Sequence, residues 1–132
     1  MRPRGIRNCN PGNIRLSNDK WQGLRPQQTD HNFFQFTEMK YGYRALMKTI
    51  RTYNKKRGCK TISDYIHRWA PSCENSTIDY IKSVCEYMDV AQDYVLNVED
   101  KNEMCNLAAA ISRHENGVTP NMNEIYQGWN LL

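Results

Sequence analysis

The chain has 132 residues, of which 39% are hydrophobic and 24% charged, a composition typical of one soluble globular domain spanning residues 1–132. It contains no run of about 18 apolar residues, which argues against insertion into a membrane, and no apolar stretch follows its basic N-terminus, so no signal peptide is expected. The formal net charge of +4 favours contact with anionic polymers without choosing among them.

Residues 1–35 differ in composition from the rest of the chain. Asn, Gly, Pro and Arg are frequent there, and the apolar residues form short islands at positions 14–16, 21–24 and 33–36. Short apolar segments between turn-forming residues predict loops with a small hairpin, and they do not favour helices.

From Glu38 onward, apolar residues recur at three- and four-residue steps, which is the period of an amphipathic helix. Gly58 and Gly117 are typical of the position after a helix, and Pro71 disfavours helical geometry in the residue before it. The predicted helices cover residues 41–56, residues 61–69, a segment beginning at Ser76 or Thr77, residues 100–114 and residues 123–129. The predicted fold class is therefore mainly α, with a small N-terminal hairpin and loop region.

The five cysteines are widely spaced along the chain, at Cys9, Cys59, Cys73, Cys85 and Cys105. Neither a CxxC pair nor a Cys/His ligand pattern occurs, so neither a metal site nor a cofactor is expected. Reduced, partly buried thiols are the simpler interpretation, and a disulfide is the alternative if the protein is exported.

The densest basic cluster occupies residues 55–57. It lies at the predicted C-terminal end of the first long helix, where the helix dipole favours cations. A nucleic-acid groove is the alternative interpretation. Because no recognised DNA-binding motif accompanies the cluster, we expect no nucleic-acid partner.

Glu115 lies at the C-terminal end of the Ala-rich predicted helix. The helix dipole disfavours a negative charge there, and partial burial would add to this effect. A carboxyl group that such surroundings keep protonated is what a general acid for glycosidic bond cleavage requires. On local sequence alone, an ordinary solvated glutamate in the last helical turn is the commoner alternative.

Two further polar segments are candidates for substrate contacts. Glu74 precedes the expected helix start, where its charge is favoured, so it suits accepting hydrogen bonds better than donating a proton. Helix capping is the alternative for Glu74. Residues 10–12 read Asn-Pro-Gly, a tight-turn signal that Asn8 and Asn13 flank. Clustered amide side chains suit sugar hydroxyl and acetamido groups, and plain turn formation is the alternative.

Several motifs together resemble a family of phage and prophage proteins. The motifs are Arg4-Gly5-Ile6-Arg7-Asn8-x-Asn10-Pro11-Gly12-Asn13-Ile14-Arg15, Trp21-Gln22-Gly23-Leu24, Phe33-x-x-Phe36, Gly42-x-Arg44-Ala45 and Trp69-Ala70-Pro71-x-x-Glu74-Asn75-x-Thr77-x-x-Tyr80. Members are often described as structural proteins and are thought to be virion-associated lytic enzymes. The resemblance covers nearly the whole chain. It implies a place on the virion, or export to the wall or periplasm by another route, with virion or secretion components as partners.

A second resemblance is to soluble lytic transglycosylases. These carry, in order, a helix ending in Glu-Ser, a Gly-Leu-Met-Gln turn, an Ala-Tyr-Asn segment and a Glu-Thr-x-x-Tyr-Val segment. Here residues 10–14 stand for the turn, residues 52–54 look like the third segment and residues 74–81 are similar to the fourth. The helix ending in Glu115 follows them instead of coming first. Asn116 replaces the usual Ser, and the Gly-Leu-Met-Gln turn is not literally present.

This order implies a circularly permuted, lysozyme-like domain, since domain termini often lie close together at the surface. It predicts that Glu115 lies near Asn13, Tyr53 and Glu74. The implied reaction is cleavage of the β-1,4 bond between N-acetylmuramic acid and N-acetylglucosamine in peptidoglycan glycan strands. Glu115 would be the one catalytic acid. The implied substrate-binding residues are Asn13, Asp30, Tyr53, Asn54, Glu74, Thr77 and Tyr80.

Two alternatives stay open at this stage. A hydrolytic muramidase would need a second carboxylate, for which Asp30, ahead of the aromatic residues 33–36, is a better candidate than Asp19. A non-catalytic virion or wall-binding protein could keep the fold without the activity, because a fold does not establish a function.

Overall fold

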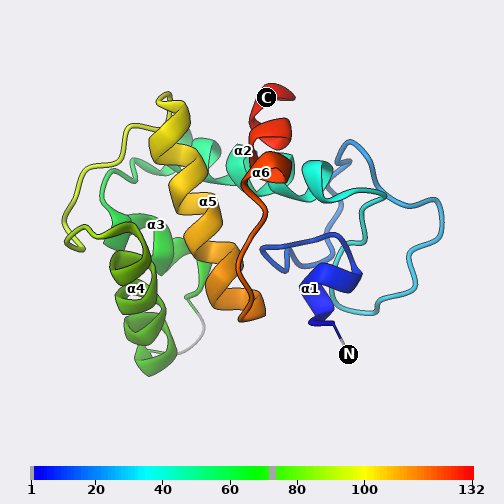
Figure 1. The fold of residues 1–132 in the computed structure, drawn as a ribbon, viewed down its shortest axis with the longest axis horizontal. Helices are drawn as coiled ribbons and strands as arrows, with labels where there is room; N and C mark the ends of the chain where they lie inside the picture. Colours follow the sequence, from blue (N-terminus) through cyan, green and yellow to red (C-terminus); the bar gives the residue numbers. More distant parts are fainter. Residues whose placement is uncertain (1, 72–73) are drawn as a thin grey trace.

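The computed structural model describes residues 2–71 and 74–132, without the side chains of residues 74 and 75. Helices make up 54% of the chain, which confirms the mainly α fold class. In chain order they are α1 (Arg4–Arg7), α2 (Met39–Arg57), α3 (Ile62–Trp69), α4 (Glu74–Met88), α5 (Lys101–Asn116) and α6 (Met122–Asn130) (Figure 1). No helix in these ranges has the length and apolar sequence needed to cross a membrane.

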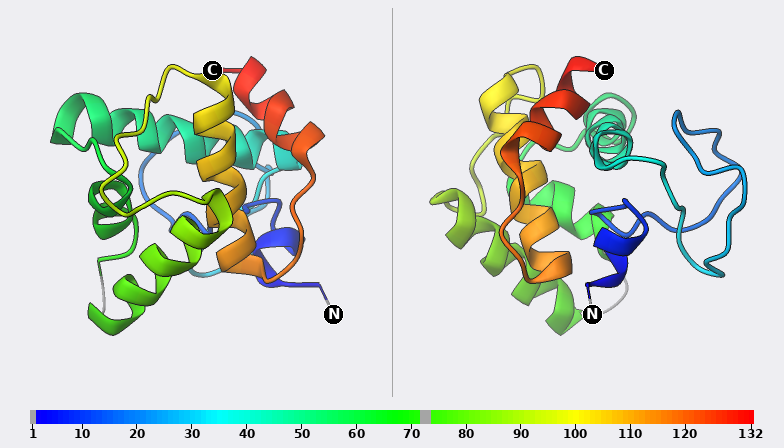
Figure 2. Two further views of the ribbon diagram at one scale, coloured as in Figure 1. Left: turned by 60° about the vertical axis from the view of Figure 1, so that its left-hand side comes forward. Right: turned by 45° about the vertical axis from the view of Figure 1, so that its right-hand side comes forward.

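Helix α5 is the central element of the fold. It packs against α1, α2, α4 and α6, and it runs between α4 and α6 through the middle of the molecule (Figures 1 and 2). Its buried positions include many small side chains, which allow close helix packing: Ala108, Ala109, Ala110 and Ser112. The hydroxyl of Tyr43 on α2 donates a hydrogen bond to Ser112 Oγ at 2.9 Å. Burial raises the pKa of Tyr43 to about 12, so this phenol stays protonated.

The main apolar core lies among α2 to α6. Its largest fully buried side chains are Tyr43, Leu46, Met47, Ile50, Ile62, Tyr65, Ile66, Met104, Leu107, Ile111 and Ile125. A smaller cluster of Phe34, Phe36 and Ala45 holds the N-terminal loops against α2. The helical period read from the sequence therefore marks the faces that are buried.

The N-terminal segment contains fewer strand contacts than the predicted hairpin would have. Arg15 pairs with Phe33, and Leu24 pairs with Phe36, each as an isolated antiparallel bridge. Side-chain hydrogen bonds replace the backbone hydrogen bonds of a regular β-ladder here. The side-chain amide of the fully buried Asn10 donates to the carbonyl oxygen of Phe34 at 2.9 Å. The short helix α1 (Arg4–Arg7) was not predicted, because one turn is too short to show a helical period.

The ends of four predicted helices lie within about two residues of those observed, an ordinary difference between assignments. Gly58 and Gly117 follow α2 and α5 with φ of 70° at each, as predicted. The side chain of Asp100 caps α5 by accepting from the backbone N–H of Glu103 at 3.0 Å. The basic residues 55–57 occupy the last turn of α2, which confirms their predicted place at a helix C-terminus.

The start of α4 is the boundary that the sequence predicted wrongly. The helix begins at Glu74, so Glu74 lies within it. Neither Ser76 nor Thr77 is its N-cap. Thr77 is buried, and its hydroxyl donates to the carbonyl oxygen of Ala70. A Ser or Thr suits a cap by its chemistry, but here a tertiary contact uses the Thr77 hydroxyl instead.

Gly128 marks a close approach of α6 to α2. A Cβ atom at this position would lie 2.9 Å from the carbonyl oxygen of Lys40 and 2.9 Å from Cβ of Tyr43. We expect Gly128→Ala to lower the free energy of unfolding by about 1–3 kcal/mol, measured by urea denaturation, because the extra methyl group forces the helices apart. Gln127→Ala, an exposed control in the same helix, should change it by less than about 0.5 kcal/mol. Equal losses in the two variants would contradict close packing at Gly128.

Candidate active site

The last turn of α5 presents the half-buried carboxylate of Glu115 to two hydrogen-bond donors. Asn13 Nδ2 donates to Oε1 at 2.8 Å, and the Tyr80 hydroxyl donates to Oε2 at 2.8 Å. These donors precede Glu115 by 102 and 35 residues. No residue that the structure describes forms a salt bridge with Glu115. Both donors are uncharged, so Glu115 is held by hydrogen bonds and not by an ion pair.

Tyr80 is held firmly in the orientation that reaches Glu115. Its ring stacks on His114, with centroids 3.8 Å apart and planes at 30°. Burial, together with the adjacent Glu115 carboxylate, raises the pKa of Tyr80 far above its usual value. The phenol therefore keeps its proton and acts as a donor.

The other donor, Asn13, belongs to a turn that is tied to the end of α5. Asn13 has φ of 51°, a left-handed conformation that Asn tolerates better than most residues. Asn116 Nδ2 donates to the carbonyl oxygen of Pro11 at 2.9 Å. A Cβ atom on Gly5 would collide with Asn116 Oδ1, so a glycine at this position lets α1 lie against α5. We call these contacts the α5–turn junction.

Glu115 lines a cleft of about 480 Å³ between the N-terminal loops, α2 and the segment after α3. Three aromatic side chains line it: Phe33, Tyr53 and Trp69. Thr49 and Arg15 add polar groups, and Glu115 is the one carboxylate among the described lining residues. Aromatic walls with a few placed polar groups are typical of sites that bind small molecules or polymer segments.

The predicted neighbourhood of Glu115 is confirmed for two of its three members. Asn13 is hydrogen-bonded to Glu115, and Tyr53 lines the same cleft. The side chain of Glu74 lies outside the described residues, so its proximity to Glu115 stays a prediction. Tyr80, expected to bind substrate, contacts Glu115 directly and is itself largely buried.

Two other candidate residues serve the walls of the cleft or the fold around it. Asn54 is not among the lining residues. Its Nδ2 donates to the carbonyl oxygen of Cys59 at 2.9 Å and to the Tyr65 hydroxyl at 3.1 Å, which fixes the chain after α2. Thr77 donates to the carbonyl oxygen of Ala70, a cleft-lining residue. Thr77 therefore supports the cleft wall from behind.

Asp30 does not line the cleft that contains Glu115. Its carboxylate accepts two hydrogen bonds from the Arg4 guanidinium, at 2.7 and 2.8 Å, and one from Asn8 at 2.9 Å. The backbone N–H groups of Asn32 and Phe33 donate to it as well. The Arg4 contact, aided by these donors, holds the pKa of Asp30 well below its usual range. Asp30 thus organises the N-terminal loops as a charged hydrogen-bond acceptor.

Sequence reasoning did not single out two residues that help to form the site. Thr49 precedes Tyr53 by four residues, so the helical period places both on one face of α2 and could have revealed Thr49. His114 meets Tyr80 only because α4 packs against α5. No local pattern marks such a contact between helices.

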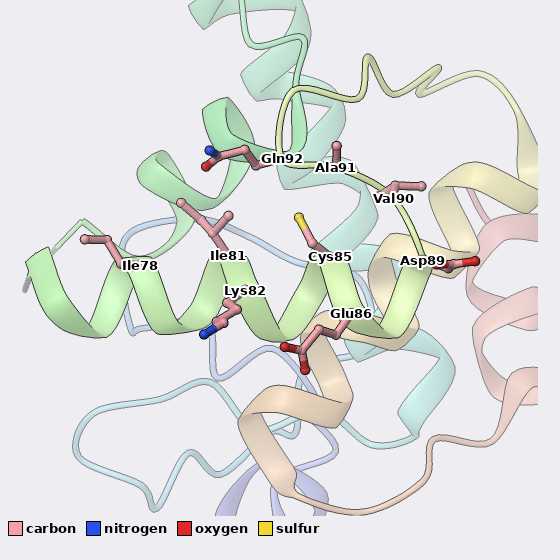
Figure 3. Close-up of a pocket in the computed structure, with 9 residues that line it drawn as sticks. All are labelled: Ile78, Ile81, Lys82, Cys85, Glu86, Asp89, Val90, Ala91 and Gln92. Atoms are coloured by element: carbon pink, nitrogen blue, oxygen red, sulfur yellow. The ribbon is translucent and has the colours of Figure 1, made fainter.

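A larger hollow of about 730 Å³ lies along α4 and does not include Glu115 (Figure 3). Ile78 and Ile81 give it an apolar wall, and its carboxylates are Glu86 and Asp89. Both acids are exposed, and neither makes a side-chain hydrogen bond to a residue that the structure describes. The smaller cleft is therefore the better candidate active site, because its carboxylate is held in position.

The described cysteines form no disulfide. Cys9, Cys59, Cys85 and Cys105 have free thiols, and Cys73 lies outside the described residues. Burial raises the pKa of the Cys59 and Cys85 thiols and raises that of Cys105 to about 11. Within residues 2–71 and 74–132, no group of three His, Cys, Asp or Glu residues is arranged to hold a metal ion.

Fold and site together define a mainly α protein with one hydrogen-bonded carboxylate in an aromatic cleft. No family model matches the sequence. The chain is similar to Protein P5 of Pseudoalteromonas phage PM2, with 35% identity over 130 residues, covering 96% of this chain and 79% of the relative. The chain therefore belongs to the family of Protein P5.

The ion pair of Asp30 predicts a pH-dependent stability. Because the folded-state pKa of Asp30 is depressed, its carboxylate stabilises the fold above its usual pKa of about 4, and this contribution is lost as the pH falls further. Asp30→Asn should therefore lower the melting temperature near neutral pH, and the gap to the wild type should narrow below about pH 4. Thermal unfolding across this pH range measures both effects.

Asp19→Asn is the matched control for this experiment, because Asp19 is exposed and, among the residues that the structure describes, bonds only to Ser17 in its own turn. It should leave the melting temperature nearly unchanged. An Asp30→Asn deficit that stays constant as the pH falls would show that shape, and not charge, accounts for the role of Asp30.

Proposed function

We propose that the protein cleaves the glycan strands of peptidoglycan at the β-1,4 bond between N-acetylmuramic acid and N-acetylglucosamine, with Glu115 as the general acid. The observation that carries the proposal is the position of Glu115, held by Asn13 and Tyr80 at the edge of an aromatic cleft. A general acid must be oriented towards the atom that it protonates, and two short hydrogen bonds provide that orientation.

The α5–turn junction supports a lysozyme-like fold that is circularly permuted. In the unpermuted order, the helix that bears the acid precedes the turn. Here the turn comes first in the sequence, yet it lies directly against the end of that helix through the contact of Asn116 with Pro11. This contact between the turn and the helix end is what a permuted order requires.

The composition of the cleft favours a mechanism that needs one carboxylate. Glu115 donates its proton to the leaving glycosidic oxygen as the bond to C1 of the muramic acid breaks. The resulting carboxylate then takes the proton from the 6-hydroxyl of the same sugar as that oxygen bonds to C1, which yields a 1,6-anhydro end. Asp30, the second carboxylate that a hydrolytic muramidase would need, is outside the cleft and is paired with Arg4.

The remaining cleft residues have roles that follow from their positions. Asn13 and Tyr80 orient the acid, and Thr77 supports the wall at Ala70. Tyr53 and Trp69 offer ring faces against which sugar rings can pack. The phage relative supports a place on a virion, where the protein would meet the wall together with other virion components.

Replacement of Glu115 by Gln is the direct test. The amide keeps the size of the side chain but has no proton to donate as an acid, so we expect lysis of purified cell walls to fall by at least about 10²-fold. Clearing of a wall suspension measures this activity. Glu86→Gln, at an exposed glutamate on α4 away from the cleft, should lyse walls like the wild type. If Glu115→Gln lyses walls as fast as the wild type, Glu115 is not the acid.

A wild-type protein that binds walls from several bacteria and lyses none would favour the non-catalytic alternative. Binding is measured by co-sedimentation with the same walls. In that case the cleft would serve recognition, and Glu115→Gln should change only the amount of protein that is bound.

The products distinguish the two enzymatic mechanisms. We expect fragments that end in 1,6-anhydro-muramic acid, each lighter by one water than the hydrolytic product, because Glu115 has no partner carboxylate in the described cleft lining. Mass spectrometry of the released muropeptides measures this difference. Reducing ends formed by the wild type would instead indicate a muramidase. Asp30 would then be the first candidate for its second carboxylate.

A further inference from the structure

A third hollow, of about 490 Å³, opens beside the cleft between the end of α2 and α3. The side chains that matter for its chemistry are those of Arg57, His67, Arg68 and Pro71, which we call the basic pocket. Pro71 lines both the basic pocket and the cleft of Glu115, so the two hollows are neighbours with a shared wall.

The two arginines give the basic pocket its charge. Neither Arg57 nor Arg68 forms a salt bridge with any residue that the structure describes. Asp64, the acid of this hollow, already accepts from the backbone N–H groups of Lys60 and Thr61 at 3.0 Å each, as part of the cap of α3. Arg68 also lies close to the Cys59 thiol. Among the described residues, neither guanidinium group has a carboxylate partner, and both side chains are exposed, so an external anion can reach them.

The charge of the basic pocket extends to the cleft. Tyr53, a cleft-lining residue, has its pKa raised by burial, and the positive charges of Arg68 and Arg57 oppose that shift. Both guanidinium groups therefore lie near Tyr53, a residue of the cleft wall. A polymer lying in the cleft would present its side groups within reach of the basic pocket.

Peptidoglycan carries such side groups, because a peptide stem with free carboxylates hangs from each muramic acid. A guanidinium group matches a carboxylate with two parallel hydrogen bonds. We propose that the basic pocket binds a carboxylate of the peptide stem while the glycan occupies the cleft, so that the protein prefers peptide-bearing strands to stripped ones. This inference rests on the proposed function for its substrate, and it assigns Arg57 and Arg68 as specificity-determining residues.

Direct binding of a small muropeptide tests the inference without any cleavage. The probe is N-acetylmuramyl dipeptide with its free carboxylates, titrated into the wild type and into Arg57→Gln, Arg68→Gln and the double variant by calorimetry. We expect the affinity to fall about tenfold in each single variant, because each removes a charge-assisted contact. Lys56→Gln, an exposed change at the same end of α2 but outside the hollow, should bind like the wild type.

Two comparisons show whether a guanidinium–carboxylate contact is responsible. The fully amidated form of the dipeptide should bind the wild type about as weakly as the acid binds Arg68→Gln. Arg68→Lys, which keeps the charge but loses the planar fork, should fall between the wild type and Arg68→Gln. Equal affinity of the wild type for the acid and the amide would overturn the proposal, and so would unchanged binding in the double variant. Circular dichroism of each variant checks its folding.

The cleavage assay separates this inference from the proposed function. Peptide-bearing strands and amidase-stripped strands are compared, and the preference of the wild type for the former should vanish in the double variant. If the wild type cleaves both kinds of strand at equal rates, the basic pocket does not select peptide-bearing strands. Glu115 would still be the proposed acid. If no strand is cleaved, the proposed function fails, and muropeptide binding still decides the inference. Binding of a teichoic acid phosphate polymer, but not of the muropeptide, would also overturn it.

Discussion

The α5–turn junction is the constraint on which the candidate site depends. Asn116 ties the last turn of α5 to the carbonyl oxygen of Pro11, and Asn13 then reaches the carboxylate of Glu115. Gly5 leaves the space that this contact needs. Without the junction, the cleft would lose the wall that the N-terminal turn provides and Glu115 would lose one of its two donors. Junction and site are therefore one structural unit.

Two acidic residues near the N-terminal loops have opposite environments. Glu115 has uncharged donors, whereas Asp30 is paired with the Arg4 guanidinium and keeps a depressed pKa. A carboxyl group that works as an acid must be able to take up a proton, and a carboxylate that stabilises a loop is most effective when it never does. Under the proposed function, these two environments match an acid at Glu115 and a structural anion at Asp30.

The sequence predicted most of the helices and part of the site, for different reasons. Helices α2, α3, α5 and α6, and all of α4 except its start, followed from an apolar period that is a local property of the chain. The meeting of Glu115 with Asn13 followed from the order of motifs in a resembling family. The pairing of Asp30 with Arg4, 26 residues apart, and the stacking of Tyr80 on His114 were not predictable. They arise from tertiary packing, which has no signature within a single segment.

The long sequence separation between Glu115 and its donors has a consequence for when the site forms during synthesis. A chain that leaves the ribosome exposes Asn13 first, then Tyr80, and only much later the end of α5. Domains fold as units once enough of their chain is available, so the site cannot form until nearly the whole domain has been made. No fragment that stops before α5 can hold a positioned acid. During synthesis, the site therefore stays unformed until α5 has been made.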